Sequence, residues 1–216
     1  RNPVTIPHGI GDRFRTHDQC PARPECVPAG EYLLYVSKFD VYKHHYEVVL
    51  AYAGLPESIR ERFALVLAGE TDLPEAKRVT NLISEIGLIE QIMLIGAVAH
   101  HELPAVYHHA KLVLFASSCE NCPNILLEAL GSGRPVLSSD VMPMPEFGGD
   151  AVVYFSPFEP NRILAAMQTV LSDEDCAARL AAAAVRRSSL YDWARTAGET
   201  WTRIFRLLDD ARADRG

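Results

Sequence analysis

Residues 112–138 read LVLFASSCENCPNILLEALGSGRPVLS, a stretch that contains one complete strand–helix–strand pattern. The run Leu112–Ala116 is apolar on both alternating faces, which predicts a buried strand. Residues 123–130 predict a helix that ends at Gly131, and a second strand starts at Val136. A strand, a covering helix and a parallel strand form the unit from which parallel sheets are built.

The same alternation extends over most of the chain. Short apolar runs predict further strands at 31–36, 63–68, 91–95 and 152–155. Apolar residues at helical spacing predict helices at 42–53, 74–86, 101–109, 161–171, 173–187 and 193–210. Strands that are apolar on both faces need helices on both sides of the sheet. We therefore predict an α/β fold with a Rossmann-like, doubly wound parallel sheet.

Composition excludes several classes of protein. The 216 residues are 48% hydrophobic and 23% charged, which is typical of a globular domain with a full core. The net charge of -7 argues against nucleic acid as a partner, since that would need a basic surface. No apolar stretch approaches the roughly 20 residues that cross a bilayer. The five scattered cysteines favour reduced thiols, and we expect a cytoplasmic location.

The two ends of the chain lie outside the repeating pattern. The chain has no initiator Met and residues 12–30 have no period, so residues 1–30 are predicted to be a linker from a missing N-terminal domain. Residues 31–192 form the predicted α/β domain. Residues 193–216 form a closing helix with an apolar stripe, which we expect to pack on or toward the N-terminal domain.

Two acids lie eight positions apart in the opening stretch. Glu120 is on the loop before the predicted helix, and Glu128 falls one to two turns into it among leucines. In open α/β sheets, ligands bind at such loops beyond the carboxyl ends of strands. A carboxylate in apolar surroundings needs donors, and a vicinal diol would supply two hydroxyls. A single Glu would more simply stabilise a helix dipole or pair with a core Arg, but for this pair we favour ligand binding.

Two lysines occupy the loop after the strand 31–36. Lys38 and Lys43 lie where a helix is expected to start, and the helix dipole disfavours positive charge there. A pyrophosphate bound at that helix N-terminus would make both cations favourable. The alternative is that both lysines are simply solvated.

These motifs resemble the retaining glycosyltransferases with the GT-B fold, the group 1 (family 4) class. Glu120 and Glu128 match its E-x7-E motif, and nearly the whole chain follows the family's order. The other matching segments are residues 6–9, 35–43, 67–69, 94–96, 102–110, 133–136, 145–146 and 191–193. The resemblance implies that this chain is the C-terminal domain of a two-domain GT-B enzyme.

The resemblance also implies an activity and roles for residues. The domain would bind a nucleotide diphosphate sugar, and the whole enzyme would transfer a hexose to an acceptor with retention. Glu128 would hold the ribose hydroxyls. The catalytic residues would be Glu120, at the sugar, and Lys38 and Lys43, which would hold the diphosphate and assist its departure. The sugar would also meet Asn121, Cys122, Pro123 and Asn124, and the base would lie against Gly69, Gly96 and Val98.

Three segments depart from the family pattern. Ser37-Lys38 stands where Gly-Arg is usual, and Lys lacks the bidentate fork of Arg. Lys43-His44 stands where Lys-Gly is usual, and residues 121–123 replace a common Gly-Phe-Gly, which leaves the sugar open. A non-catalytic nucleotide-sugar-binding module is therefore an alternative. A nucleotide-sugar isomerase on the same fold is another.

The resemblance sets the expected partners. These are the nucleotide-sugar donor and the missing acceptor-binding domain, without which this chain is expected to be inactive. The full-length enzyme is a candidate for peripheral association with a membrane. No metal or other cofactor is expected, since the resembled fold holds the diphosphate with cations and helix ends.

The cysteines and histidines give only weak evidence for a metal site. A zinc site at Cys119 and Cys122 would need distant partners at Cys20 and Cys26, which nothing in the sequence supports. Adjacent histidines on a helix diverge by about 100° and cannot grip one ion from a single face. We therefore predict that the pairs 44–45, 100–101 and 108–109 are surface or capping residues.

Overall fold

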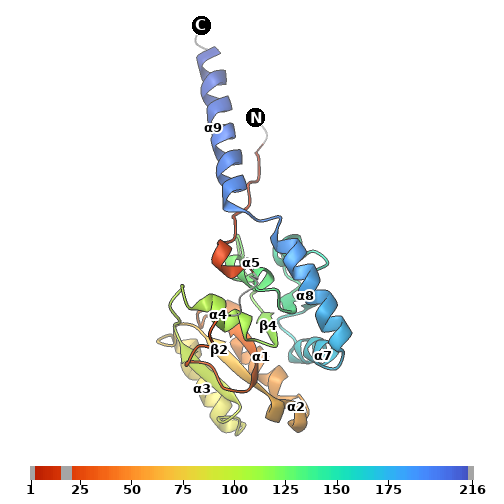
Figure 1. Ribbon diagram of the computed structural model, residues 1–216. Coiled ribbons are helices and arrows are strands. Elements are labelled where there is room, and N and C mark those ends of the chain that lie inside the picture. The colour runs from red at the N-terminus through yellow and green to blue at the C-terminus, as the bar shows by residue number, and fades with distance from the viewer. Residues whose placement is uncertain (1–2, 16–20, 214–216) are drawn as a thin grey trace.

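The computed structural model describes residues 3–15 and 21–213, which fold around one parallel sheet (Figure 1). The strand order is β3-β2-β1-β4-β5-β6. The strands are β1 Glu31–Val36, β2 Phe63–Ala68, β3 Ile92–Gly96, β4 Leu112–Phe115, β5 Val136–Ser139 and β6 Val153–Phe155. Every strand pair is parallel, which confirms the predicted doubly wound α/β fold.

Helices connect and cover the strands. They are α1 His45–Ala53, α2 Glu57–Arg62, α3 Pro74–Glu85, α4 Leu103–His108, α5 Asn124–Gly131, α6 Met144–Gly148, α7 Pro160–Leu171, α8 Glu174–Ser188 and α9 Trp193–Ala213. Because parallel crossovers are right-handed, α1 and α3 cover one face of the sheet, and α4, α5 and α6 cover the other. Helix α7 packs on α1, and α8 packs on α5. The short helices α2 and α6 are not apparent from the sequence.

The strand order reverses at the centre of the sheet. Chain connections move outward from β1 to β3 on one side and from β4 to β6 on the other, so β1 and β4 are neighbours. At such a switch point the loops leave the carboxyl ends of the two strands in opposite directions and open a crevice. The connection after β1 carries the predicted lysines, and the loop after β4 carries Glu120 and leads into α5, which carries Glu128.

Tyrosines in the core bind backbone carbonyls. Tyr32, Tyr35 and Tyr52 are fully buried, and their hydroxyls donate to the carbonyl oxygens of Val106 at 2.6 Å, Lys43 at 2.6 Å and Phe63 at 2.8 Å. A buried hydroxyl without a partner would be costly, so these bonds fix where each ring lies. The bond from Tyr35 ties the loop after β1 to the centre of the sheet.

The described part of the predicted linker lies against the domain. Ile10, Phe14 and Val27 are buried in the same core as the strands, and the short 3-10 helix η1, Asp12–Phe14, packs on α5. Arg15 donates to the carbonyl oxygen of Tyr191 at 2.8 Å. Residues 16–20 of this segment lie outside the described residues.

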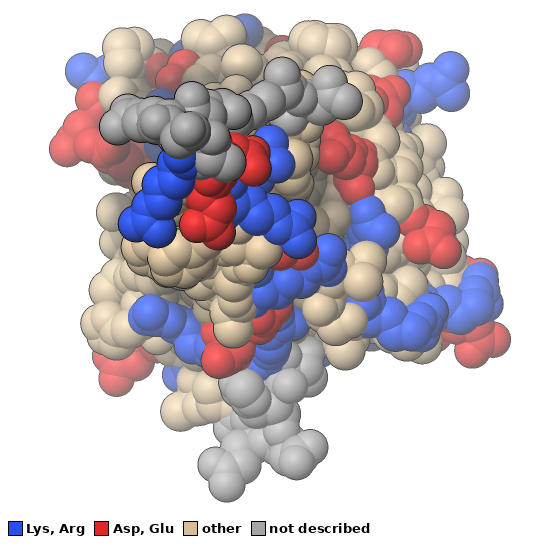
Figure 2. All heavy atoms as spheres, turned by 90° about the horizontal axis from the view of Figure 1, so that it is seen from above, with Lys and Arg blue, Asp and Glu red and all other residues tan. Residues whose placement is uncertain are grey.

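Helix α9 projects away from the body of the domain, and the N-terminal segment runs beside it (Figure 1). Its apolar side chains Trp201, Phe205 and Leu208 are exposed, so the predicted stripe faces outward. Figure 2 looks onto this end of the molecule, where Lys and Arg lie among Asp and Glu. None of the described helices has both the length and the apolar character needed to cross a membrane.

The connection from β1 to α1 differs from the prediction in one respect. The expected helix 42–53 is broken: a 3-10 turn η2, Val41–Lys43, is followed by His44 in the left-handed region at φ 53° and ψ 36°, and α1 begins only at His45. His44 is buried but stands at the cap position between η2 and α1, as one of the two predicted alternatives has it, whereas His45 is buried inside α1 and the prediction is wrong for it. Burial, with Lys43 nearby, lowers the pKa of His45 to about 3.

A glycine lets the loops after β1 and β2 approach each other. A Cβ on Gly69 would lie 1.8 Å from the carbonyl oxygen of Ser37. Two backbone hydrogen bonds hold this close approach in place. The N–H of Ser37 donates to the Ala68 carbonyl oxygen at 2.8 Å, and the N–H of Gly69 donates to the Gly96 carbonyl oxygen at 2.8 Å. No side chain fits at position 69 unless the strand ends move apart.

Replacing Gly69 by Ala is expected to lower the free energy of unfolding by about 1–3 kcal/mol, the usual cost of overpacking. Chemical denaturation of the variant measures this cost. Gly30→Ala is the matched control, because a Cβ there meets nothing within 4 Å. Equal stability of the two variants would contradict the close approach.

The left-handed conformation of His44 predicts an unusual order of stabilities. His44→Gly should be more stable than His44→Ala by about 1 kcal/mol, because Gly adopts positive φ without steric cost and Ala does not. Both variants lose the same side-chain contacts. The difference between their free energies of unfolding, measured by thermal or chemical denaturation, therefore reports the cost of the left-handed backbone conformation alone. An Ala variant as stable as the Gly variant would show that residue 44 is not left-handed.

Candidate functional site

The loops after β1 and β4 are joined by an ion pair. The ammonium group of Lys43 donates to Glu120 Oε1, and the two side chains are only 5% and 16% exposed. The ammonium also lies over the rings of Tyr42 at 5.1 Å and Phe115 at 5.4 Å. A cation this buried needs a counter-charge. Lys43 is therefore not a solvated lysine.

Further hydrogen bonds hold these two loops together. The N–H of Ser118 donates to the Tyr42 carbonyl oxygen at 2.8 Å, and His44 Nε2 lies 2.8 Å from Ser118 Oγ. His44 Nδ1 lies 3.5 Å from Glu47 Oε2, which ties the same ring to α1. The position of Lys43 relative to Glu120 is thus set by backbone and side chains on both sides.

Lys38 lies at the rim of the crevice. Its side chain is half exposed and its ammonium is 3.2 Å from Asp40 Oδ2. Hydrogen bonds with Tyr42 and Asp40 raise the pKa of Lys38 above its ordinary value, so the side chain stays charged at neutral pH. One exposed and one buried cation therefore flank the N-terminus of α1.

Two helix N-termini face this crevice without a side-chain cap. His44 precedes α1 and Pro123 precedes α5, and neither side chain accepts a hydrogen bond from the first turn of its helix. The first N–H groups of a helix have no partner within the helix and carry partial positive charge. With Lys38 and Lys43 beside α1, the site is chemically suited to an anion such as a diphosphate.

Glu128 lies in the second turn of α5 and is 15% exposed. The Tyr107 hydroxyl donates to its Oε2 at 3.4 Å, and His100 Nε2 is 3.4 Å from its Oε1. Burial raises the pKa of Glu128 above its ordinary value, although the hydrogen bond to His100 acts to lower it. Each oxygen keeps lone pairs for a further donor.

The carboxylate of Glu128 borders a cavity of about 240 Å³, called here the Glu128 cavity. Of the predicted residues, Lys38, Gly69 and Val98 line it as well. Gly96 does not line the cavity itself. Its φ is 71°, and its carbonyl oxygen accepts a hydrogen bond from the N–H of Gly69, which does line the cavity. The remaining lining residues are Val36, Ser37, Ala68, Ala97, His100, Leu103 and Ile125.

Glu120 borders a different cavity, of about 590 Å³, called here the Glu120 cavity. Asn121 and Cys122 line it with Phe147 and the N-terminal residues 5–8. Pro123 and Asn124 follow at the start of α5, and Asn124 Oδ1 is 3.1 Å from His8 Nδ1. The predicted residues thus form two groups, one at each acid, with the start of α5 between them.

Sequence reasoning missed side chains that come from other loops. His100 and Leu103 reach the Glu128 cavity from the segment after β3, and Ile125 reaches it from α5. His8 reaches the Glu120 side from the N-terminal segment. The rule that ligands bind at strand ends already pointed to the loop after β3. No local pattern identifies His8.

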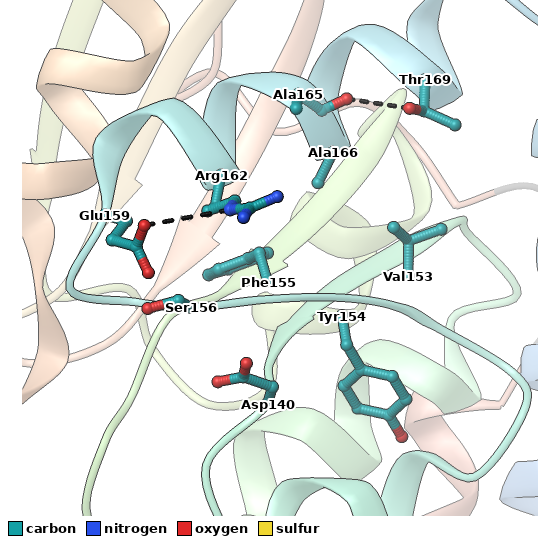
Figure 3. A pocket seen from close by; sticks show the side chains of 10 residues that line it. All are labelled: Asp140, Val153, Tyr154, Phe155, Ser156, Glu159, Arg162, Ala165, Ala166 and Thr169. Atoms are coloured by element: carbon teal, nitrogen blue, oxygen red, sulfur yellow. Dashed lines mark hydrogen bonds and ion pairs between the residues drawn. The ribbon is translucent and has the colours of Figure 1, made fainter.

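A further cavity of about 460 Å³ lies between β6 and α7 (Figure 3). Asp140, Tyr154 and Arg162 line it, and Arg162 is 3.9 Å from Glu159. None of the predicted site residues lines it. Among residues 3–15 and 21–213, no cluster of three or more His, Cys, Asp and Glu residues could hold a metal ion.

Comparison with known proteins places the chain in a family. The family described as glycosyl transferases group 1 matches residues 25–187. The serotype-specific mannosyltransferase WbdA of Escherichia coli is 26% identical over 215 residues, which are 97% of this chain and 26% of WbdA. This chain therefore spans about a quarter of the length of that relative.

Solved structures share the fold. Sucrose-phosphate synthase from Thermosynechococcus elongatus superposes with a TM-score of 0.79 at 24% identity, covering 95% of this chain and 52% of that one. HepE from Anabaena, in complex with UDP-glucose, superposes with a TM-score of 0.73 at 19% identity, covering 82% of this chain and 49% of that one. The family match covers most of this chain, and the solved structures share its fold. The chain therefore belongs to the group 1 glycosyltransferases, with the Rossmann-like fold of a GT-B domain.

Proposed function

We propose that this chain is the donor-binding domain of a hexosyltransferase, which takes a hexose from a nucleotide diphosphate sugar and transfers it to an acceptor with retention. The observation that carries the proposal is the pairing of the two acids with two different cavities on either side of the start of α5. One cavity fits the nucleoside and the other fits the sugar.

The nucleoside part rests on the Glu128 cavity. Its carboxylate is mostly buried beside apolar walls from Val36, Val98 and Ile125. A ribose diol would satisfy both carboxylate oxygens, and the apolar walls suit the face of a base. Gly69 supports this assignment because its missing side chain lets the ends of β1 and β2 approach each other, and both ends line the cavity.

The diphosphate part rests on Lys38 and Lys43, each of which also pairs with one carboxylate, Asp40 and Glu120 respectively. Lys38 lines the Glu128 cavity, while Lys43 is held against Glu120, so a diphosphate running between the two cavities would pass both lysines and the start of α1. As the bond to the sugar breaks, charge grows on the leaving phosphate. Preorganised cations and N–H dipoles would stabilise that charge.

The sugar part rests on Glu120 and the segment 121–124. Lys43 donates to Oε1 of Glu120, which leaves Oε2 to accept from a sugar hydroxyl. Cys122 stands at the wall of this cavity and limits its shape. We assign to these residues the contacts that decide which hexose is bound.

The acceptor belongs to another domain. The exposed stripe on α9, with Trp201, Phe205 and Leu208, is the surface we assign to packing against an N-terminal acceptor-binding domain. The charge balance and free cysteines support a cytoplasmic enzyme that uses a cytoplasmic donor and, as a full-length protein, approaches a membrane only peripherally.

Nucleotide binding tests this proposal. Replacing Glu128 by Ala should lower the affinity for the nucleoside diphosphate at least roughly tenfold, because hydrogen bonds from ribose to a charged acceptor are lost. Isothermal titration with UDP, GDP and ADP measures it and identifies the base. Glu90→Ala, an exposed acid before β3, is the matched control.

Two results would contradict the proposal. One is the absence of binding by the unchanged chain at millimolar nucleotide, and the other is equal affinity in the Glu128→Ala and Glu90→Ala variants. Incubating the chain with donor alone adds a second readout. Without an acceptor-binding domain we expect no turnover, and a rearranged nucleotide sugar would instead indicate an isomerase.

A further inference from the structure

The loop between β3 and α4 places two adjacent histidines near the Glu128 cavity, and they have different surroundings. His100 lines the cavity and contacts the carboxylate of Glu128. His101 is exposed, and among the described residues it makes no hydrogen bond or ion pair. The two histidines belong to the same loop. What distinguishes them is where each side chain lies, since only His100 contacts Glu128.

His100 is held in place although it is 60% exposed. Its ring lies 5.1 Å from the ring of Phe14, at 57°, and Phe14 is buried. Its Nε2 is 3.4 Å from Glu128 Oε1. The imidazole thus bridges the N-terminal segment and α5, with one edge on the carboxylate and the other open to solvent.

The carboxylate of Glu128 needs help to stay ionised. Burial raises its pKa, and a protonated carboxyl has lost acceptor capacity that a diol requires. Tyr107 binds Oε2 but is neutral, because burial raises its pKa well above the ordinary value. A hydrogen bond from His100 Nε2 at Oε1 favours the charged form.

The charged and titratable groups that face Glu128 come from four segments. They are Arg13 on η1, Lys38 after β1, His100 after β3 and Tyr107 on α4. Arg keeps its charge in proteins, the pKa of Lys38 is raised, and Tyr107 stays neutral. Among these groups, Glu128 is the one whose charge decides whether the diol has an acceptor, and burial and the hydrogen bond to His100 act on that charge in opposite directions.

We propose that His100 is a positioning residue for ribose binding: its imidazole holds the carboxylate of Glu128 ionised and directed at the Glu128 cavity. The inference rests on the proposed function, because it matters only if Glu128 binds ribose. His100 need not touch the nucleotide itself. It acts through the carboxylate, which accepts the two hydroxyls.

This role gives nucleotide binding a defined dependence on pH. Affinity falls as pH drops toward the pKa of Glu128, because the protonated carboxyl binds the diol poorly. Removing His100 removes the group that lowers this pKa, so the fall should begin at a higher pH in the variant. A role limited to folding would lower affinity equally at every pH.

The test compares His100→Ala with its neighbour His101→Ala. UDP, GDP and ADP are titrated by calorimetry between about pH 5 and 8, and the tightest one is compared with its 2′,3′-dideoxy counterpart. We expect His100→Ala to lose roughly tenfold in affinity for the ribonucleotide near the acid end of this range and to be unchanged for the dideoxynucleotide. His100→Gln, which keeps a donor, should restore much of the affinity at neutral pH but not at acid pH.

The possible failures are distinguishable. If Glu128→Gln weakens ribonucleotide binding while His100→Ala and His101→Ala match at every pH, the proposed function stands and the role of His100 is wrong. An equal loss for the ribonucleotide and the dideoxynucleotide in His100→Ala would also overturn it. If no nucleoside diphosphate binds the unchanged chain, both the proposed function and the role of His100 fail.

Discussion

The ion pair between Lys43 and Glu120 joins the loop after β1 to the loop after β4, and the candidate site depends on it. Both side chains are mostly buried, so neither charge is stable there alone. The pair sits at the point where the strand order reverses, which is where an open α/β sheet provides a crevice. The bonds of Tyr35 and Ser118 around it fix the start of α1, and with it the position of both lysines.

The strained backbone at His44 belongs to the same junction. A left-handed residue that is not Gly costs about 1–2 kcal/mol, and it persists where surrounding contacts determine it. Here the contacts are those of the ring with Ser118 and Glu47. The side chain that replaces the family's glycine therefore also clamps the two loops together. Rigidity at this point would suit the proposed binding of a diphosphate in one geometry.

Local patterns predicted most of the fold, because strands such as 31–36 are short apolar runs and helices such as 74–85 carry apolar residues at helical spacing. The acids Glu120 and Glu128 were found because they share one short motif. The contacts that define the site were not predictable, since Lys43 meets Glu120 across 77 positions and His100 meets Glu128 across 28. The burial of His44 and His45 was not predicted, because the sequence suggested a continuous helix. No local sequence pattern indicates that residue 44 adopts a left-handed conformation.

In the proposed binding mode, one nucleoside diphosphate spans from the Glu128 cavity to the Lys43–Glu120 pair. A crystal structure of this chain with the nucleoside diphosphate that binds it most tightly tests this binding mode. We expect both ribose hydroxyls within hydrogen-bond distance of the Glu128 carboxylate and the phosphates at the start of α1, beside Lys38 and Lys43. A nucleotide bound between β6 and α7, or with its ribose away from Glu128, would contradict it.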